Sequence, residues 1–460
     1  MENKIEKDLT VGNVPRTLIK FAMPIFVGNL LYSGYSIINT IWVGNLLGTE
    51  SLGAVAISFP LILILIGIIS GATMATSILI SRFFGAKDYE SANKVIRNSY
   101  TITIIGTIVL TLLGVLGSDL ILKAMGTPDE IFGSASSYLK IVMLGTGLMY
   151  FYYLLTSILR GIGDTLTALI FLIISTAINA ILDPIFLLGL GPIPKMGLNG
   201  AAYASLIAQF ISLVLGFLYI RRKKSNLQLM PKKWEFDKVL SVTILKIGIP
   251  SIVQQLLVQI GAVFVTSMVN FYGGAAVAAF GAASRIDTLV SMPAVAMSMA
   301  IASLTGQNLG ANKSENIKEV LKWGLIMTSI VTFIISIISI AIPKEILYIF
   351  VKDKEVINFG IDYLRIVGIG YVIFSSVIVV NGVINGSGKT MSTLKITVFA
   401  LWIIRVPLAF ILTRTSLGVK GIWVAILISF VCNLAASVYY YFSGKWKIAQ
   451  QIKPQIADVS

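Results

Sequence analysis

A carboxylate and a proline interrupt an apolar stretch in the first half of the chain. In NAILDPIFLLG, Asn179, Asp183 and Pro184 stand in a run that is otherwise almost entirely apolar. Thr176, Asn179 and Asp183 follow one another at i, i+3 and i+7, so on a helix they would share one face. Pro184 has no N–H and therefore leaves the carbonyl of Ala180 without its helical partner. Ionisable groups inside such segments usually have a function.

The oxygens of this face could bind a cation. A carboxylate, an amide oxygen and a free carbonyl together suit a hard cation such as Na⁺, with Asp183 and Asn179 as ligands. The same carboxyl group could take up a proton instead, as intramembrane acids do in proton relays. A third interpretation is a structural aspartate that is hydrogen-bonded to a neighbouring helix. The residues alone leave these three interpretations open.

Two other apolar stretches carry polar faces. One lies near the N-terminus and consists of Tyr32, Tyr35, Ser36, Asn39 and Thr40. The other is rich in glutamine and consists of Gln254, Gln255 and Gln259. A polar face on a membrane helix points away from lipid. For the face near the N-terminus, the alternative role is hydrogen bonding between helices. The residues that we expect to contact a substrate are Tyr32, Tyr35, Ser36, Thr176, Gln255 and Gln259.

Three further charged residues lie inside apolar stretches of the second half. Arg285 and Asp287 are two positions apart, so they point to different sides of a helix and could be structural partners of other helices. Arg405 stands two residues before Pro407, close to the position that corresponds to Asp183 in the first half. The role of these three residues stays open.

The composition indicates a membrane protein. Of the 460 residues, 56% are hydrophobic and only 12% are charged, whereas a soluble domain carries about 25% charged residues. The net charge of +15 is spread over short loops and forms no basic stripe, which argues against nucleic acid as a partner. The chain has no histidine and one cysteine, which excludes a zinc enzyme or a Ser-His-Asp hydrolase. We expect neither enzymatic activity nor a cofactor.

The apolar stretches predict an all-α membrane protein with twelve transmembrane helices. Each stretch reaches the roughly 20 residues that a span needs. The spans lie near 17–43, 52–76, 93–117, 135–158, 165–190, 197–220, 240–266, 276–302, 318–342, 360–383, 390–413 and 419–442. The longest hydrophilic segment separates the two sets of six. We therefore expect an N-terminal lobe over 1–220, a cytoplasmic linker over 221–238 and a C-terminal lobe over 239–460.

The two halves repeat one another. YLKIV (138–142) matches YLRIV (363–367), and RGIGDT (160–165) matches NGSGKT (385–390), with the same offset along the chain in both cases. Because six is an even number, both copies must have the same orientation in the membrane. The pattern predicts two six-helix lobes that are related by a pseudo-twofold axis along the membrane normal, as in secondary transporters.

A nucleotide-binding motif is nearly present but is rejected. NGVINGSGKT (381–390) resembles a P-loop, yet Val383 stands where the first glycine should be, and Gly382 is one residue too far away. The segment also joins two apolar spans rather than a strand and a helix. We expect a tight glycine turn here, so the energy source is an ion gradient rather than a nucleotide.

Charge in the loops predicts the orientation. Most Lys and Arg residues fall in the loops and tails that lie on the same side as both termini. By the positive-inside rule, both termini are cytoplasmic and the protein is a multi-pass protein of the cell (inner) membrane.

Together these stretches resemble the multidrug and toxic compound extrusion (MATE) family over nearly the whole chain. The motifs that carry the resemblance are INTIWVGNLLG (38–48), RGIGDT, NAILDPIFLLGLG, GLNGAAYAS (197–205) and RIDTLVSMPAVAMSMAIASLTGQNLGA (285–311). The resemblance implies a twelve-helix antiporter that exports cationic and amphipathic compounds in exchange for H⁺ or Na⁺. It also implies that Asp183 and Asn179 belong to an ion-coupling site in the first lobe, with Ser205 at a position where the family has Thr.

The chain departs from the family at two places. Asn39 stands where members usually have Asp, so the form of the site with two carboxylates is missing. Gln255 and Gln259 stand in the seventh span, where some members have an acid, so a second-lobe site of that kind is not expected. We expect Asp183, Asn179, Asn39 and Ser205 to couple one ion per cycle.

The sequence therefore predicts a secondary active multidrug efflux antiporter. Its partners would be small cationic or amphipathic molecules and membrane lipid, and we expect a monomer. The alternative is a lipid or glycolipid flippase on a related fold, for which Arg285 and Arg405 could hold anionic head groups. The choice between H⁺ and Na⁺ and the identity of the substrate stay open.

Overall fold

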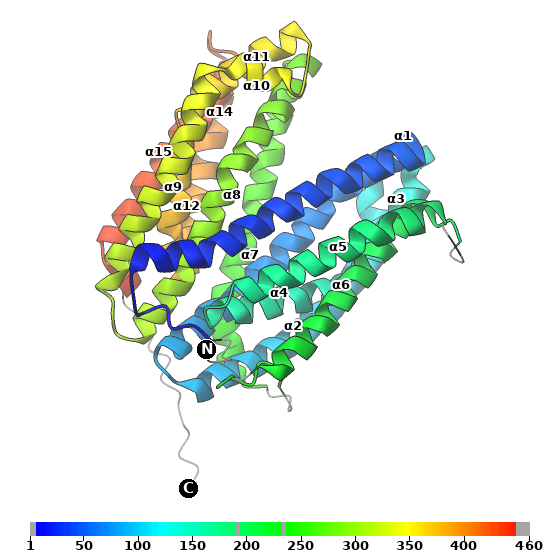
Figure 1. Cartoon of the computed structure of the whole chain (residues 1–460). Coiled ribbons are helices and arrows are strands. Elements are labelled where there is room, and N and C mark those ends of the chain that lie inside the picture. The colour runs from blue at the N-terminus through cyan, green and yellow to red at the C-terminus, as the bar shows by residue number, and fades with distance from the viewer. Residues whose placement is uncertain (1–5, 190, 192–193, 224, 232–235, 448–460) are drawn as a thin grey trace. The chain divides into compact units, whose positions relative to one another are not determined.

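The computed structural model describes every residue except 1–5, 190, 192–193, 224, 232–235 and 448–460 (Figure 1). All regular elements in this part of the chain are helices. The chain forms two compact units, Met1–Asp8 with Met23–Lys246, and Leu9–Ala22 with Ile247–Ser460. The expected lobes and linker stay a prediction, and linker residues 224 and 232–235 lie outside the described part.

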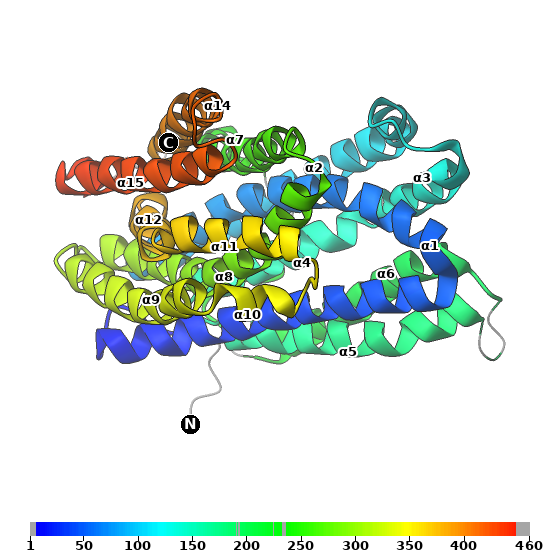
Figure 2. The ribbon, with the colours of Figure 1, turned by 90° about the horizontal axis from the view of Figure 1, so that it is seen from above.

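The helices of the first half follow the expected order. They are α1 (Val14–Gly85), α2 (Tyr89–Ala124), α3 (Asp129–Leu144), α4 (Thr146–Gly161), α5 (Leu166–Leu188) and α6 (Gly197–Arg222). α5 and α6 run side by side (Figures 1 and 2). The buried core of this unit consists of apolar residues from α1 to α6, such as Val43, Leu65, Leu139 and Leu187.

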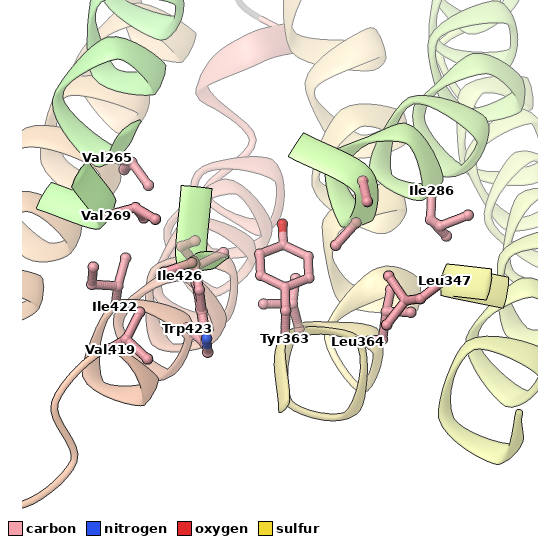
Figure 3. Packing of buried hydrophobic residues seen from close by; sticks show 14 of the residues in the cluster. Val265, Val269, Ile286, Leu347, Tyr363, Leu364, Val419, Ile422, Trp423 and Ile426 are labelled. Atoms are coloured by element: carbon pink, nitrogen blue, oxygen red, sulfur yellow. The ribbon is translucent and has the colours of Figure 1, made fainter. Parts of the chain in front are cut away.

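The second half has more and shorter elements. They are α7 (Lys238–Asn270), α8 (Gly274–Gly310), α9 (Asn316–Ala341), α10 (Pro343–Tyr348), α11 (Lys354–Gly368), α12 (Tyr371–Gly386), α13 (Thr390–Thr397), η1 (Val398–Arg405), α14 (Val406–Leu412), α15 (Lys420–Phe442) and η2 (Lys445–Lys447). Its core packs Trp423 and Tyr363 between aliphatic residues of α7, α8 and α15 (Figure 3). The ring centroids of Tyr363 and Trp423 are 4.8 Å apart, and the rings meet edge to face.

The helices account for twelve membrane spans. Within the described residues, nine helices are long and apolar enough to cross a membrane, and two bent helix pairs bring the number to eleven. α1 alone has 72 residues, and its backbone leaves the helical conformation at Gly48. Because a span needs only about 20 residues, α1 contains two spans. The twelve spans predicted from the sequence are thus confirmed.

The spans differ from regular, straight helices in three details. Between the spans expected at 17–43 and 52–76, only Gly48 leaves the helical conformation, with φ 83° and ψ −175°. Only glycine adopts this conformation without strain, since it lacks a Cβ. The spans expected at 135–158 and 360–383 are bent by 45° and 49°, between α3 and α4 and between α11 and α12. No proline stands at either bend, so the bends could not be predicted from the sequence.

The third difference concerns the span expected at 390–413. It contains the π-helix η1, which ends at Arg405, directly before α14. A π-helical turn widens the backbone and is common near functional sites. The sequence carries no signal for it, because a π-helix and an α-helix have the same composition.

Backbone conformations recur in the two halves with the same spacing along the chain as the matching sequence motifs. Three pairs of positions separated by this same offset share a positive φ, namely Gly48 and Gly273, Lys87 and Asn312, and Gly163 and Gly388. The bends of the two broken spans also correspond, at Gly145 and Gly370. Turns of one kind at one offset are what a duplicated six-helix unit requires, so the duplication extends to backbone conformation.

Candidate coupling site

Asp183 lies in the middle of a hydrogen-bonded group in the first unit. It stands on α5, and its side chain is fully buried, with 0% exposure. Its Oδ2 accepts a hydrogen bond of 2.5 Å from the Tyr35 hydroxyl on α1. Its Oδ1 accepts one of 2.9 Å from the Asn179 amide, one turn earlier on α5. Both carboxylate oxygens are therefore engaged by neutral donors.

The group extends to two more side chains. The Asn39 amide donates to the Tyr35 hydroxyl at 3.2 Å, and the Ser205 hydroxyl on α6 donates to Asn179 Oδ1 at 3.1 Å. The structure thus brings together all four residues expected at the ion-coupling site. It adds Tyr35, which the sequence placed among the substrate contacts. We call Tyr35, Asn39, Asn179, Asp183 and Ser205 the Asp183 network.

Close packing of α5 and α6 positions this network. A Cβ at Gly200 would lie 2.6 Å from the carbonyl oxygen of Phe186, so only glycine permits the helices to approach here. Ser205 follows Gly200 by little more than one turn, and the approach therefore brings its hydroxyl to Asn179. α5 continues as a helix through Pro184 to Leu188. The proline thus lies next to Asp183 without ending the helix that carries it.

Asp183 has no basic partner among the described residues. The ion pairs in this part of the chain, such as Lys7 with Asp164, lie elsewhere. Tyr138 is close enough to interact electrostatically with Asp183, but a tyrosine side chain cannot carry a positive charge. A buried carboxylate without a counter-ion is costly even when it is hydrogen-bonded. Neutralisation of Asp183 by a cation would therefore remove this cost.

The remaining expected substrate contacts are more scattered. Tyr32 is 49% exposed, and Ser36 accepts a hydrogen bond from Thr40 through its carbonyl. Thr176 is half-buried on α5. None of these three side chains takes part in the hydrogen bonds of the Asp183 network.

The glutamine face belongs to the second unit. Gln255 is exposed and Gln259 is half-buried on α7. Their neighbour Gln254 donates to the Thr397 hydroxyl at 2.8 Å and so ties α7 to α13. Gln254 therefore has a helix-packing role.

A second acid inside the spans, the half-buried Asp287, was not assigned a role from the sequence. Asp287 on α8 accepts hydrogen bonds from the Tyr363 hydroxyl on α11 and, at 2.8 Å, from the Tyr371 hydroxyl on α12. Arg405 lies within electrostatic range of it. The acid in the eighth span was visible in the sequence as a candidate functional residue. Its two tyrosine partners were not, because they lie far along the chain and helical periodicity does not reveal contacts at such separations.

The described residues contain no group of three His, Cys, Asp or Glu side chains that could hold a metal ion. The segment that resembles a P-loop spans the end of α12 and the start of α13 and follows no strand in that region. A Cβ at Gly386 would lie 2.4 Å from the carbonyl oxygen of Ala302 on α8. The glycine thus permits close packing of two helices.

Twelve apolar spans in two repeats, with an uncompensated acid buried in the first, define a multi-pass membrane transporter. The chain belongs to the MatE family, the multidrug and toxic compound extrusion transporters, whose family model matches residues 24–185 and 250–411, once in each repeat. Members of this family are transporters and not enzymes.

Two relatives and a solved structure extend the likeness over the whole chain. The chain is 31% identical over 442 residues to the probable multidrug resistance protein YoeA of Bacillus subtilis, covering 95% of each chain. It is also 31% identical to the probable multidrug resistance protein YpnP of the same organism, over 96% of this chain and 97% of that one. A MOP superfamily transporter from Pyrococcus furiosus aligns with a TM-score of 0.87, at 26% identity, over 95% of this chain and 96% of that one.

Proposed function

We propose that this protein is a secondary active efflux antiporter that exports cationic and amphipathic compounds in exchange for protons. The observation that carries the proposal is the fully buried Asp183, whose hydrogen-bond partners are neutral and which has no basic partner among the described residues. The relatives named as multidrug resistance proteins support small-molecule export as the direction of transport.

The charge of Asp183 provides the driving step. An ionised carboxylate in this site attracts a cation from the outer side, because the network leaves its charge uncompensated. Binding of the cation neutralises the carboxylate and so weakens the hydrogen bond that the Tyr35 hydroxyl donates to Oδ2. The packing of α1 against α5 then changes, and a state that holds substrate weakly becomes favoured. Coupling requires only that ion and substrate prefer different states.

The hydrogen bonds favour H⁺ over Na⁺. Na⁺ would need several oxygen ligands that face it. Asn179 presents its amide N–H to Asp183, and its oxygen accepts from Ser205. A proton on Oδ2 needs only one change, since the carboxyl group then donates to the Tyr35 oxygen instead of accepting from it. With a single acid in the network, we propose one proton per cycle.

The proposal also covers the oligomeric state and the orientation in the membrane. We propose that the protein acts as a monomer in the cell membrane with both termini in the cytoplasm, as the distribution of Lys and Arg predicts. No cofactor takes part in this mechanism, and lipid contacts only the outer apolar faces of the helices.

The test is transport in proteoliposomes with the pH gradient and the Na⁺ gradient imposed separately. Ethidium uptake driven by a pH gradient, with no response to Na⁺, is the expected result. Transport driven by Na⁺ alone would overturn the choice of proton. Absence of transport under both gradients, together with translocation of a fluorescent lipid, would favour the flippase alternative that Arg285 and Arg405 suggest.

A further inference from the structure

Asp287 connects the two arms of a bent helix. α11 and α12 form one broken span with a 49° bend. Tyr363 lies in α11 and Tyr371 is the first residue of α12, so one residue stands on each side of the bend. Both hydroxyls donate to Asp287, each to a different carboxylate oxygen. Tyr363 and Tyr371 are 2% and 1% exposed, so neither hydroxyl can readily exchange this acceptor for water.

The first repeat has the same bend without this acid. At the offset that relates the two repeats, Ile62 corresponds to Asp287, Tyr138 to Tyr363 and Thr146 to Tyr371. The equivalent bend of 45° lies between α3 and α4. Ile62 and Tyr138 pack against the hydrophobic core of their unit. A bend of this kind can therefore form without a carboxylate, and the acid is a feature of the second repeat alone at this position.

Few titratable or charged groups lie around Asp287. The titratable groups that face it are Tyr363 from α11, Tyr371 from α12 and Arg405 from η1. Arg405 donates through Nε to the Ser429 hydroxyl at 2.8 Å, and its guanidinium lies 5.2 Å from the ring centroid of Phe430. In the described part of the chain, Arg405 does not come within ion-pair distance of Asp287. Arg285, on the same helix as Asp287, is exposed.

A proton on Asp287 would change this arrangement in a defined way. An ionised carboxylate accepts from both phenols, whereas a protonated one carries an O–H donor on one oxygen. One tyrosine must then accept instead of donate, or turn away. Because the two tyrosines lie on opposite sides of the bend, the change acts on the angle between α11 and α12.

We propose that Asp287 is a second proton-binding site and that its occupancy sets the bend between α11 and α12. The ligand is a proton from the aqueous phase, and the ionised form holds both arms through Tyr363 and Tyr371. The site is separate from the Asp183 network, which lies in the other unit. The proposal needs no substrate, so it stands or falls independently of the efflux function.

The experiment measures the bend directly. Spin labels are placed at Glu355→Cys and Met391→Cys in a Cys432→Ser background, because Glu355 and Met391 are exposed and flank the bend. α11 has 15 residues, or about 22 Å at 1.5 Å per residue, so a change in bend of about 10° moves its far end by roughly 4 Å. Pulsed electron–electron distance measurements between pH 5 and 9 would detect this shift.

The first repeat provides a matched control. Glu130→Cys with Leu166→Cys occupies the equivalent exposed positions of that repeat, around the bend that lacks the acid. The expected result is a pH-dependent distance in the second repeat and a constant distance in the first. A distance that does not change with pH in the second repeat would overturn the proposal, as would equal changes in both repeats.

Two variants test the residue itself. Asp287→Asn keeps the shape but cannot ionise, so the distance should equal that of the acidic wild type at every pH. A titration that persists in this variant rules Asp287 out. Tyr371→Phe removes one donor to the ionised form, so the acid-form distance should persist to a pH about 1–2 units higher. An unchanged midpoint would contradict the role of Tyr371.

Discussion

Tyr35 and Asp183 stand 148 positions apart in the sequence and share one hydrogen bond of 2.5 Å. That bond joins α1 to α5 within the first unit. Because the bond links the two helices, a change in the charge of Asp183 should affect how α1 packs against α5.

Replacing Asp183 by Asn should abolish efflux. The amide keeps the size of the side chain but cannot exchange a charge for a cation, so no ion can drive the cycle. Ethidium efflux from cells that express the variant at the normal level should fall to the level of cells without the transporter. Asp362→Asn is the control, because Asp362 pairs with Lys420 near the surface, and such pairs contribute about 0–1 kcal/mol. Normal efflux by Asp183→Asn would contradict the mechanism.

Replacing Tyr35 by Phe should raise the affinity for the coupling ion without abolishing exchange. The variant loses a donor to the ionised carboxylate, which contributes about 1.5–3 kcal/mol. The coupling ion is then held more tightly, and the ion concentration that gives half-maximal exchange should fall by about 10-fold or more. Counterflow assays in proteoliposomes can measure this value. Tyr439→Phe on α15, where Tyr439 is 78% exposed, should leave it unchanged; equal effects of both variants would argue for a general disturbance of the protein.

Replacing Gly48 by Ala should destabilise the protein. With φ 83° and ψ −175°, Gly48 is in a region that an L-residue enters only at a cost of about 1–3 kcal/mol. The melting temperature in detergent, followed by fluorescence-detected size exclusion, should therefore drop. Gly34→Ala tests the specificity of this effect, because Gly34 is helical on the same element and a Cβ there would meet nothing within 4 Å. Gly34→Ala should be neutral or slightly stabilising, and a larger loss there than at Gly48 would refute the argument.

Replacing Gly386 by Ala should separate α12 from α8. The added Cβ would approach the backbone of Ala302 to 2.4 Å, and backbone atoms cannot turn aside as a side chain can. Overpacking of this kind costs about 1–3 kcal/mol. The same melting assay should show a loss for Gly386→Ala and none for Gly281→Ala, where the space around the Cβ is open. A neutral Gly386→Ala would mean that the two helices are not held at this distance.

The sequence predicted the number of spans and the duplication because both rest on local patterns. Hydropathy marks each span, and the repeat is visible in short motifs such as YLKIV and YLRIV. The face shared by Asn179 and Asp183 follows from helical spacing, and the structure places both in one hydrogen-bonded network.

Contacts between distant segments could not be predicted in this way. Nothing in the spacing of residues assigns Tyr35 to Asp183 or Tyr371 to Asp287, because these pairs depend on how helices pack in three dimensions. The bends at Gly145 and Gly370 were missed for a related reason. Glycines are common in apolar spans, and without a proline they do not show which of them ends a helix.

The division of α1 between the two units has a practical consequence for split-protein experiments. Residues Leu9–Ala22 belong to the unit that contains Ile247–Ser460, and the Leu9 amide donates to the side chain of Gln307 at 2.8 Å. A polypeptide that begins at Ile247 would lack this piece of its own fold. A half-transporter expressed alone should therefore be incomplete, and co-expression of the two halves should restore it only when the first half retains its N-terminal segment.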